Sequence, residues 1–385
     1  MIPYGRQNID KSDIESVLKV LKSDFITQGP TTPEFEKAIT KKTNSKYACA
    51  VNSATSALHI ACLSLGIKKD DIVWTSPISF VASSNCALYC GAKVDFVDID
   101  KNTYNMSVDK LEEKLIIAKK KGKLPKALIP VHLSGQSCDM KSIKKLSIEY
   151  NFKIIEDASH AIGATYLDKP VGNCNYSDIT VFSFHPVKII TTCEGGICTT
   201  NDPNLYSKLC MYRSHGVTRH PLEMINKPDG SWYYEQQELG FNFRLNDLMS
   251  ALGISQLKKL EKFINTREKI AKFYDSLFSE TSITTPQQAN YSKSSRHLYI
   301  IRVANDRNSI FENLRNNGIG VNIHYIPIYR QPYYQKFNYN IKDFPESESY
   351  YKEAISIPIY PGLTKSQQKM IFNIIQNRQG FQTLF

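Results

Sequence analysis

The stretch VNSATSAL, residues 51–58, joins the end of an apolar run through small hydroxyl side chains directly to a helical pattern. Small side chains at such a junction let a ligand approach the backbone, and the free N–H groups at the start of a helix attract a phosphate. An ordinary helix N-cap by Ser53 or Thr55 would produce the same pattern. The junction therefore predicts a strand-to-helix unit, with either a phosphate cup or a simple cap at its turn.

Similar units surround this junction. Between residues 45 and 200, short apolar runs alternate with helical patterns, which predicts an α/β fold with a mostly parallel sheet covered on both faces. Such sheets bind ligands outside the carboxyl ends of their strands. The expected strands are residues 47–51, 72–75, 94–97, 127–131, 153–155, 179–184 and 196–199, and the expected helices are residues 55–65, 80–89, 108–120 and 140–150.

The last third of the chain has a different pattern. A loop rich in Gly, Pro and Asn at residues 221–240 precedes one long helical stretch at residues 245–278. A strand at 298–303, a helix at 306–316, a strand at 320–324 and a last helix from residue 364 are expected after it. We therefore predict a large domain over residues 1–250 and a smaller α+β domain over residues 251–385, with the long helix as the connector.

Charge and composition set limits on the function. The chain has 385 residues, 42% of them hydrophobic, and 48 Lys and Arg against 37 Asp and Glu, a net charge of +11. The densest basic run, residues 119–123, follows a helical pattern and suits a solvated helix end, so no nucleic-acid partner is expected. No run approaches the ~20 apolar residues that a spanning helix needs, and residues 1–6 lack a signal-peptide pattern. A cytoplasmic protein without membrane contact is the simplest expectation.

Several common chemistries lack their motifs. No phosphate-binding P-loop, dinucleotide fingerprint, zinc-protease motif or hydrolase nucleophile elbow occurs in the sequence. The nine cysteines are scattered singly, and the pair Cys86 and Cys90 has no second pair or nearby histidine to complete a metal set. We expect reduced, buried thiols and no metal site.

The stretch KIIEDASH, residues 153–160, is an apolar strand that ends in two acidic residues. A carboxylate buried at the ligand-binding edge of a sheet is costly unless a cation faces it. A protonated pyridine nitrogen would be such a cation, whereas a helix N-cap by Asp157 is the alternative interpretation.

The stretch TVFSFHPVK, residues 180–188, brings a hydroxyl at Ser183 and a lone lysine, Lys188, to the end of another strand. Burial among apolar neighbours would disfavour the ammonium form and free the amine as a nucleophile, although such a lysine can also extend to the surface. Phe80, just beyond a third strand end, could stack on a flat ring or belong to the core. A phosphate cup, an aromatic ring, a carboxylate and a lysine are together the parts that hold pyridoxal 5′-phosphate.

At these residues the sequence resembles the DegT/DnrJ/EryC1/StrS family of sugar aminotransferases, over nearly the whole chain. Within the family, residues 2–7, 76–82, 185–188 and 324–329 look most like the branch that serves pseudaminic acid biosynthesis. The matching stretches are ITQGP (26–30), NSATSAL (52–58), EDASHA (156–161), FSFHPVK (182–188), EGG (194–196), RSHG (213–216) and GFNFRL (240–245).

The resemblance implies a pyridoxal-phosphate-dependent transferase of fold type I, acting as a homodimer with shared active sites. It implies transfer of an amino group from L-glutamate to C4 of a UDP-linked 4-keto-6-deoxy-N-acetylhexosamine, giving UDP-4-amino-4,6-dideoxy-N-acetyl-β-L-altrosamine for surface glycans. Aminotransfer to a GDP- or dTDP-linked keto sugar is the main alternative. A non-catalytic, regulatory pyridoxal-phosphate-binding relative is another, and a related sugar dehydratase would carry histidine in place of Lys188.

The resemblance also implies roles for individual residues. Lys188 would bind the cofactor covalently, Asp157 would pair with the pyridinium nitrogen and His160 would lie beside the ring. The further cofactor contacts would be Phe80 on the ring, Ala54, Thr55 and Ser183 around the phosphate, and Asn242 reaching the cofactor phosphate of the neighbouring subunit. Ala54 departs from the family, which often has glycine there. The implied substrate contacts are Tyr4, Asp24, Phe25, Ile26, Thr27, Ile323, His324, Tyr325 and Ile326.

Overall fold

The computed structural model describes residues 1–379 and centres on a seven-stranded sheet in the order β1-β9-β8-β5-β4-β2-β3. Strand β9 runs antiparallel to both of its neighbours, whereas the pairs from β8 through β3 are parallel. The strands are β1 (Tyr47–Val51), β2 (Ile72–Thr75), β3 (Lys93–Phe96), β4 (Ala127–Ile129), β5 (Lys153–Asp157), β8 (Ile179–Ser183) and β9 (Gly196–Thr200). The predicted α/β class and all seven predicted strands are confirmed within a few residues.

Helices cover both faces of this sheet. Successive side chains of a strand point to opposite faces, so in β5 Ile155 packs in the core with α3 and α4, and Ile154 packs in the core with α5 and α6. The helices around the sheet are α1 (Lys11–Leu21), α2 (Thr31–Thr43), α3 (Ala54–Ser64), α4 (Ala82–Tyr89), α5 (Val108–Lys120), α6 (Met140–Tyr150) and α7 (Pro203–Arg213). Lys119 and Lys120 lie exposed in the last turn of α5, as predicted for the basic run.

The parallel register brings the ends of distant segments together. Asp157 ends β5 and Ser183 ends the neighbouring β8, with Asp157 opposite Val181. Ser53 follows β1 and caps α3 by accepting a hydrogen bond from the backbone N–H of Ser56. These side chains therefore share the carboxyl edge of the sheet, where an open α/β sheet binds its ligands.

The predicted single helix at residues 245–278 is wrong, because the chain forms α8 (Asp247–Leu257) and α9 (Leu260–Phe278) with a break between them. Helix α8 packs on α1 and α2, whereas α9 packs on α13 (Lys365–Gln379). At the break, Lys259 forms ion pairs with Asp10 at 2.9 Å and with the buried Asp13 of α1. This ionic contact holds the junction against α1, so the two helices can serve different cores.

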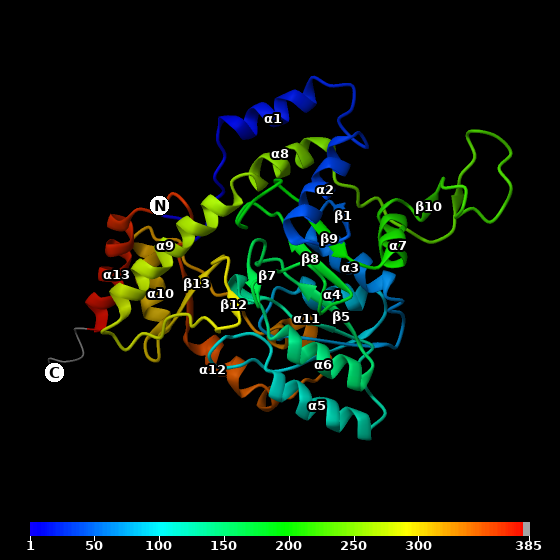
Figure 1. The fold of residues 1–385 in the computed structure, drawn as a ribbon. Helices are drawn as coiled ribbons and strands as arrows, with labels where there is room; N and C mark the ends of the chain where they lie inside the picture. The colour runs from blue at the N-terminus through cyan, green and yellow to red at the C-terminus, as the bar shows by residue number, and fades with distance from the viewer. Residues whose placement is uncertain (380–385) are drawn as a thin grey trace.

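A second core lies at one side of the molecule, where α9, α10 (Arg307–Asn316) and α13 stand together (Figure 1). Its two-stranded sheet pairs β13 (Tyr299–Arg302) with β14 (Ala354–Ile357). The predicted strand at 320–324 is wrong: Ile319 and Asn322 form single bridges to Ile2 and Ser356. The backbone near residue 320 is hydrogen-bonded to the N-terminal segment, since the Gly320 N–H donates to the Ile2 carbonyl at 2.6 Å. The domain boundary at residue 250 stays a prediction.

The remaining elements are short. A hairpin of β10 (Val217–Thr218) and β11 (Glu235–Gln236) extends away from the body of the molecule (Figure 1). The others are β6 (Thr165–Tyr166), β7 (Lys169–Pro170), β12 (Ser292–Lys293), α11 (Pro332–Gln335), α12 (Pro345–Glu353) and three 3₁₀ turns at Leu133–Gly135, Ile328–Arg330 and Ile341–Asp343.

Within residues 1–379, no helix combines the length and the apolar character that crossing a membrane requires. No group of three or more His, Cys, Asp or Glu side chains in that range is arranged to hold a metal ion. All nine cysteines are free thiols, as predicted. The expectation that they are buried holds for six of them, since Cys193 is exposed and Cys90 and Cys210 are half-buried.

Asp247 fastens the N-terminal part of the chain to α8. Its buried carboxylate accepts hydrogen bonds from the backbone N–H of Gly29 at 2.8 Å and of Thr32 at 3.1 Å, and from the Thr32 hydroxyl at 2.8 Å. The Asp247 N–H in turn donates to the Ile26 carbonyl at 3.1 Å. One side chain thus fixes the loop before α2.

We expect Asp247→Ala to lower the free energy of unfolding by about 3 kcal/mol, because buried donors left without an acceptor cost ~1–3 kcal/mol each. Urea denaturation measures this change. The control is Asp109→Ala, at an exposed position in the first turn of α5, which should change stability by less than ~0.5 kcal/mol. Equal effects of the two substitutions would contradict the role of Asp247.

Candidate active site

A cavity of about 600 Å³ opens at the carboxyl edge of the sheet. Residues far apart in the sequence meet in it, from the turn after β1, the ends of β5 and β8, the loop after β8 and the segment after Asn322. Most of the predicted site residues line this cavity: Tyr4, Ala54, Thr55, Phe80, Asp157, His160, Ser183, Lys188, Ile323, His324, Tyr325 and Ile326. Their individual roles stay predictions.

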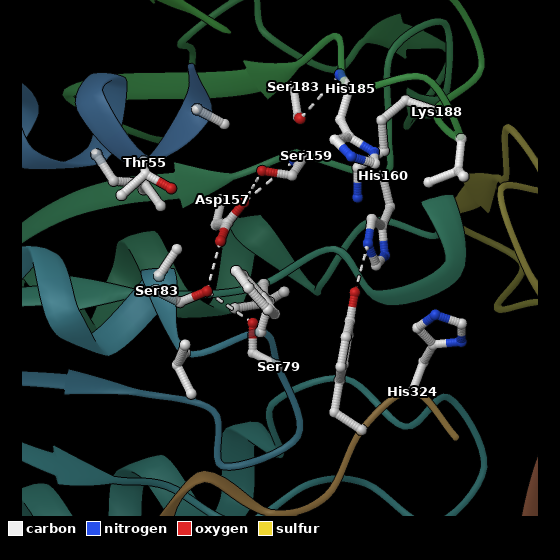
Figure 2. A pocket seen from close by; sticks show the side chains of 18 of the residues that line it. Thr55, Ser79, Ser83, Asp157, Ser159, His160, Ser183, His185, Lys188 and His324 are labelled. Atoms are coloured by element: carbon white, nitrogen blue, oxygen red, sulfur yellow. Dashed lines mark hydrogen bonds between the residues drawn. The ribbon is translucent and has the colours of Figure 1, made fainter. Parts of the chain in front are cut away.

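The Asp157 carboxylate is held by neutral groups. One oxygen accepts from the Ser83 hydroxyl at 2.6 Å, and the other accepts from the Ser159 hydroxyl at 2.6 Å and the Ser159 N–H at 3.1 Å (Figure 2). Ser79 contacts the Ser83 hydroxyl at 2.6 Å. Asp157 is only 4% exposed, and among residues 1–379 no Lys, Arg or His forms an ion pair with its carboxylate. A buried anion without a protein cation favours a cationic ligand group.

Lys188 lies on the loop after β8, where its N–H donates to the His185 carbonyl at 2.9 Å. Burial lowers the pKa of the Lys188 amine to about 8, although the Asp157 charge acts in the opposite direction. A substantial fraction of the amine is therefore neutral near physiological pH, and the neutral amine is the nucleophilic form. The loop therefore brings a nucleophile into the cavity that also holds the Asp157 carboxylate at the end of β5.

His160 is neutral and held in one orientation. Burial and the Lys188 charge keep the pKa of His160 well below its usual range. Its Nδ1 accepts from the Ser134 N–H at 3.3 Å, so the ring proton sits on Nε2, which lies 3.2 Å from the Tyr325 hydroxyl. The His297 ring packs on it at a centroid distance of 4.3 Å. His160 can therefore support a flat ligand ring without adding positive charge.

The turn after β1 can serve as an anion cup. The first N–H groups of α3 have no partners within the helix, and Ser53, Ala54 and Thr55 line the cavity at this point. Gly196 of β9 packs closely against this turn, since a Cβ at residue 196 would lie 2.5 Å from the Ala54 nitrogen. Only glycine leaves room for this approach. The geometry fits a phosphate, one of the two interpretations of the sequence, and Ser53 also forms the helix cap that was the other.

Five predicted site residues lie outside this cavity. Asn242 forms a backbone bridge with Ser214. The segment Asp24, Phe25, Ile26 and Thr27 lies before α2, and the Ile26 carbonyl binds the start of α8. Within one chain these residues do not meet the cavity, so the contacts predicted for them stay predictions.

Sequence reasoning missed several residues of the site. Ser83 and Ser159 bind Asp157, His297 packs on His160, and Glu194 and Gln331 line the cavity. The hydroxyl-rich stretch SPISFVASS at residues 76–84, directly after β2, was an available signal for Ser83. Nothing in the sequence pattern indicated His297 or Gln331, which reach the site from the last third of the chain.

Comparison with known proteins identifies the family of the chain. The family model described as "DegT/DnrJ/EryC1/StrS aminotransferase family" matches residues 7–376. A Campylobacter jejuni protein (strain 81-176) named UDP-4-amino-4,6-dideoxy-N-acetyl-beta-L-altrosamine transaminase is 42% identical over 391 residues, covering 99% of this chain and 100% of the relative. A Helicobacter pylori protein of the same name is 35% identical, with 98% of both chains covered.

Solved structures show the same fold. Helicobacter pylori PseC, described as an aminotransferase involved in the biosynthesis of pseudoaminic acid, superposes with a TM-score of 0.89 at 34% identity over 98% of both chains. The putative sugar aminotransferase Spr1654 from Streptococcus pneumoniae, in a PLP form, has a TM-score of 0.88 at 28% identity, with 99% of both chains covered.

The fold and the cavity are those of an aminotransferase with the type I fold of pyridoxal-phosphate-dependent transferases, as predicted. The chain belongs to the DegT/DnrJ/EryC1/StrS aminotransferase family.

The lowered pKa of Lys188 can be measured directly in the cofactor-free protein. After reductive methylation with ¹³C-formaldehyde, we expect one lysine signal to titrate near pH 8, against about 10.4 for ordinary lysines. Because burial disfavours the charged form, this amine should be protonated below pH 8 and neutral above it. Lys188→Arg should remove that signal alone. A wild-type spectrum in which every lysine titrates above pH 10 would contradict the assignment.

Proposed function

We propose that this protein is a pyridoxal-phosphate-dependent transaminase for a UDP-linked 4-keto-6-deoxy-N-acetylhexosamine. It would take its amino group from L-glutamate and give UDP-4-amino-4,6-dideoxy-N-acetyl-β-L-altrosamine for pseudaminic acid and surface glycan synthesis. The supporting observation is the pairing of a buried Asp157, bound by neutral hydroxyls, with a low-pKa Lys188 in one cavity. The high identity to transaminases of that name over the full chain supports the substrate.

Different residues of the chain would carry out different parts of the amino transfer. When bound, pyridoxal phosphate supplies an electron sink for a carbanion at the substrate carbon. The Asp157 carboxylate would stabilise a positive charge on the ring nitrogen, and Phe80, 58% exposed at the cavity, would cover the ring. The Lys188 amine would act first as a nucleophile and then, once freed, as the base and acid that moves a proton. Ser53, Thr55 and the start of α3 would bind the phosphate.

An aromatic cluster at the cavity suits the sugar ring. The Tyr4 ring lies 5.2 Å from that of His324, which in turn lies 4.9 Å from that of Tyr325. Burial and the Lys188 charge lower the pKa of His324 to about 3, so this histidine offers a neutral polar edge. We propose that the cluster contacts the hexose.

We further propose a homodimer in the cytoplasm. The hairpin loop between β10 and β11 exposes large apolar side chains, with Leu222 91%, Ile225 81% and Trp232 73% exposed. Exposed apolar clusters commonly mark protein interfaces. Asn242, outside the cavity of its own chain, would then contact the cofactor phosphate of the second chain, and residues 24–27 would join the shared site.

The main alternative is the same reaction on a GDP- or dTDP-linked keto sugar. The cofactor end of the cavity would be unchanged, because Asp157, Lys188 and the α3 turn do not contact the nucleotide in either case. A non-catalytic regulatory role would leave the low pKa of Lys188 without a use. A substrate test separates these possibilities.

The product of a UDP-N-acetylglucosamine dehydratase and epimerase is the substrate to offer, together with L-glutamate. We expect stoichiometric 2-oxoglutarate and a UDP-4-amino sugar, identified by mass spectrometry and NMR. Lys188→Arg should lower turnover by at least about a thousandfold, because it removes the nucleophile and proton carrier. The exposed Lys169→Arg is the matched control and should keep wild-type turnover. Turnover only with GDP- or dTDP-sugars would refute the proposed substrate.

A further inference from the structure

A second pocket, of about 450 Å³, adjoins the catalytic cavity. Val81 and Gln331 line both, so they form the boundary between the two spaces. The second pocket lies between α4 and the segment that begins α11. Nothing in the proposed amino transfer uses it.

Two partly exposed tyrosine rings line this pocket. Tyr89, at the end of α4, is 56% exposed, and Tyr333, in α11, is 59% exposed. The Lys336 ammonium lies over one face of the Tyr333 ring, 3.6 Å from its centroid, so a flat ligand would stack on the opposite face. Exposed aromatic faces bind nucleic-acid bases by stacking, and every base offers such a face. A cation beside the ring suits a ligand that also carries phosphate.

The Asn85 side chain offers hydrogen-bond donors to this pocket. The buried Tyr334 hydroxyl lies 2.6 Å from the Ser84 hydroxyl and donates to Asn85 Oδ1 at 2.5 Å. The Asn85 carbonyl is therefore engaged, and its two amide N–H groups have no hydrogen-bond partner among residues 1–379. A ligand that presents carbonyl oxygens would satisfy them.

We propose that this second pocket binds the uracil of the nucleotide sugar, with the base stacked on Tyr333 and a uracil carbonyl accepting from Asn85. This inference rests on the proposed function, which places the sugar in the catalytic cavity. The diphosphate and ribose then lead away from that cavity, and the shared boundary at Val81 and Gln331 lies between sugar and base.

The same geometry favours a pyrimidine over guanine. Uracil presents two carbonyl acceptors with one N–H between them. Guanine presents one carbonyl beside two kinds of N–H donor, and these need acceptors. Asn85 Oδ1 is already bound by Tyr334, so guanine donors would lose their hydrogen bonds with water at this edge. Unpaired polar groups of this kind weaken binding.

The test measures binding of UDP alone to the holoenzyme by calorimetry. Tyr333→Ala should raise the Kd of UDP roughly tenfold to a hundredfold, the range expected when one base loses its aromatic partner. Tyr333→Phe should keep the Kd within about twofold, because the ring remains. Ile148→Ala, an exposed apolar residue on α6, is the control with wild-type affinity. Wild-type protein should bind GDP more weakly than UDP.

The outcomes separate the two proposals. If wild-type protein binds UDP and Tyr333→Ala binds it equally well, the base subsite is wrong and the proposed substrate stands. If wild-type protein binds GDP better than UDP, both proposals are wrong. Sedimentation of each variant completes the test, because a Tyr333→Ala protein that loses affinity only by dissociating into monomers would show that the pocket serves a second copy of the chain instead.

Discussion

A buried carboxylate that forms no ion pair among residues 1–379 is the constraint around which this structure is arranged. Asp157 is fixed by the hydroxyls of Ser83 and Ser159, which orient it and remove none of its charge. The cost of burying such a group is several kcal/mol unless a cation arrives. Strand β5 places the carboxylate at the sheet edge, and α4 carries Ser83 to it. The site is in this sense prepared for a positively charged ring.

The other residues that line the cavity form no ion pair with Asp157. Lys188 is the one amine among the lining residues, and burial lowers its pKa to about 8. His160, His297 and His324 all have lowered pKa values, for which burial is the largest cause and the Lys188 charge a smaller one. The cavity therefore combines the buried carboxylate of Asp157 and the exposed carboxylate of Glu194 with one adjustable amine and several neutral rings. This distribution suits a cofactor that brings its own positive nitrogen and its own phosphate.

The sequence predicted the sheet and the residues at its strand ends because both depend on local patterns. An apolar run followed by small or acidic residues predicts a strand and its carboxyl end, which located Asp157, Ser183 and the α3 turn. The break between α8 and α9 depends on ion pairs of Lys259 with Asp10 and Asp13 across more than 240 positions, and no local pattern contains it. The wrongly predicted strand at 320–324 also reflects a contact between distant parts of the chain, since the Gly320 N–H donates to the Ile2 carbonyl.

Contacts from the last third of the chain were harder still to predict from residue patterns. His297 and Gln331 reach the site through tertiary packing, and their surroundings in the sequence carry no signal of this. Tyr325 and its neighbours were placed at the site by family resemblance, and the structure puts the Tyr325 hydroxyl 3.2 Å from His160. Asn242 was also placed by resemblance, and a single chain leaves it outside the cavity. The proposed homodimer would bring Asn242 to the cofactor phosphate of the second chain.

The central claim is that Asp157 holds a positive charge on the ring nitrogen of bound pyridoxal phosphate. The direct measurement is the ¹⁵N chemical shift of that nitrogen, recorded for labelled cofactor bound to wild-type protein and to Asp157→Asn. We expect a protonated nitrogen in the wild type at neutral pH and an unprotonated one in the variant, because the amide carries no charge. The same protonated signal in both proteins, or an unprotonated one in the wild type, would contradict it.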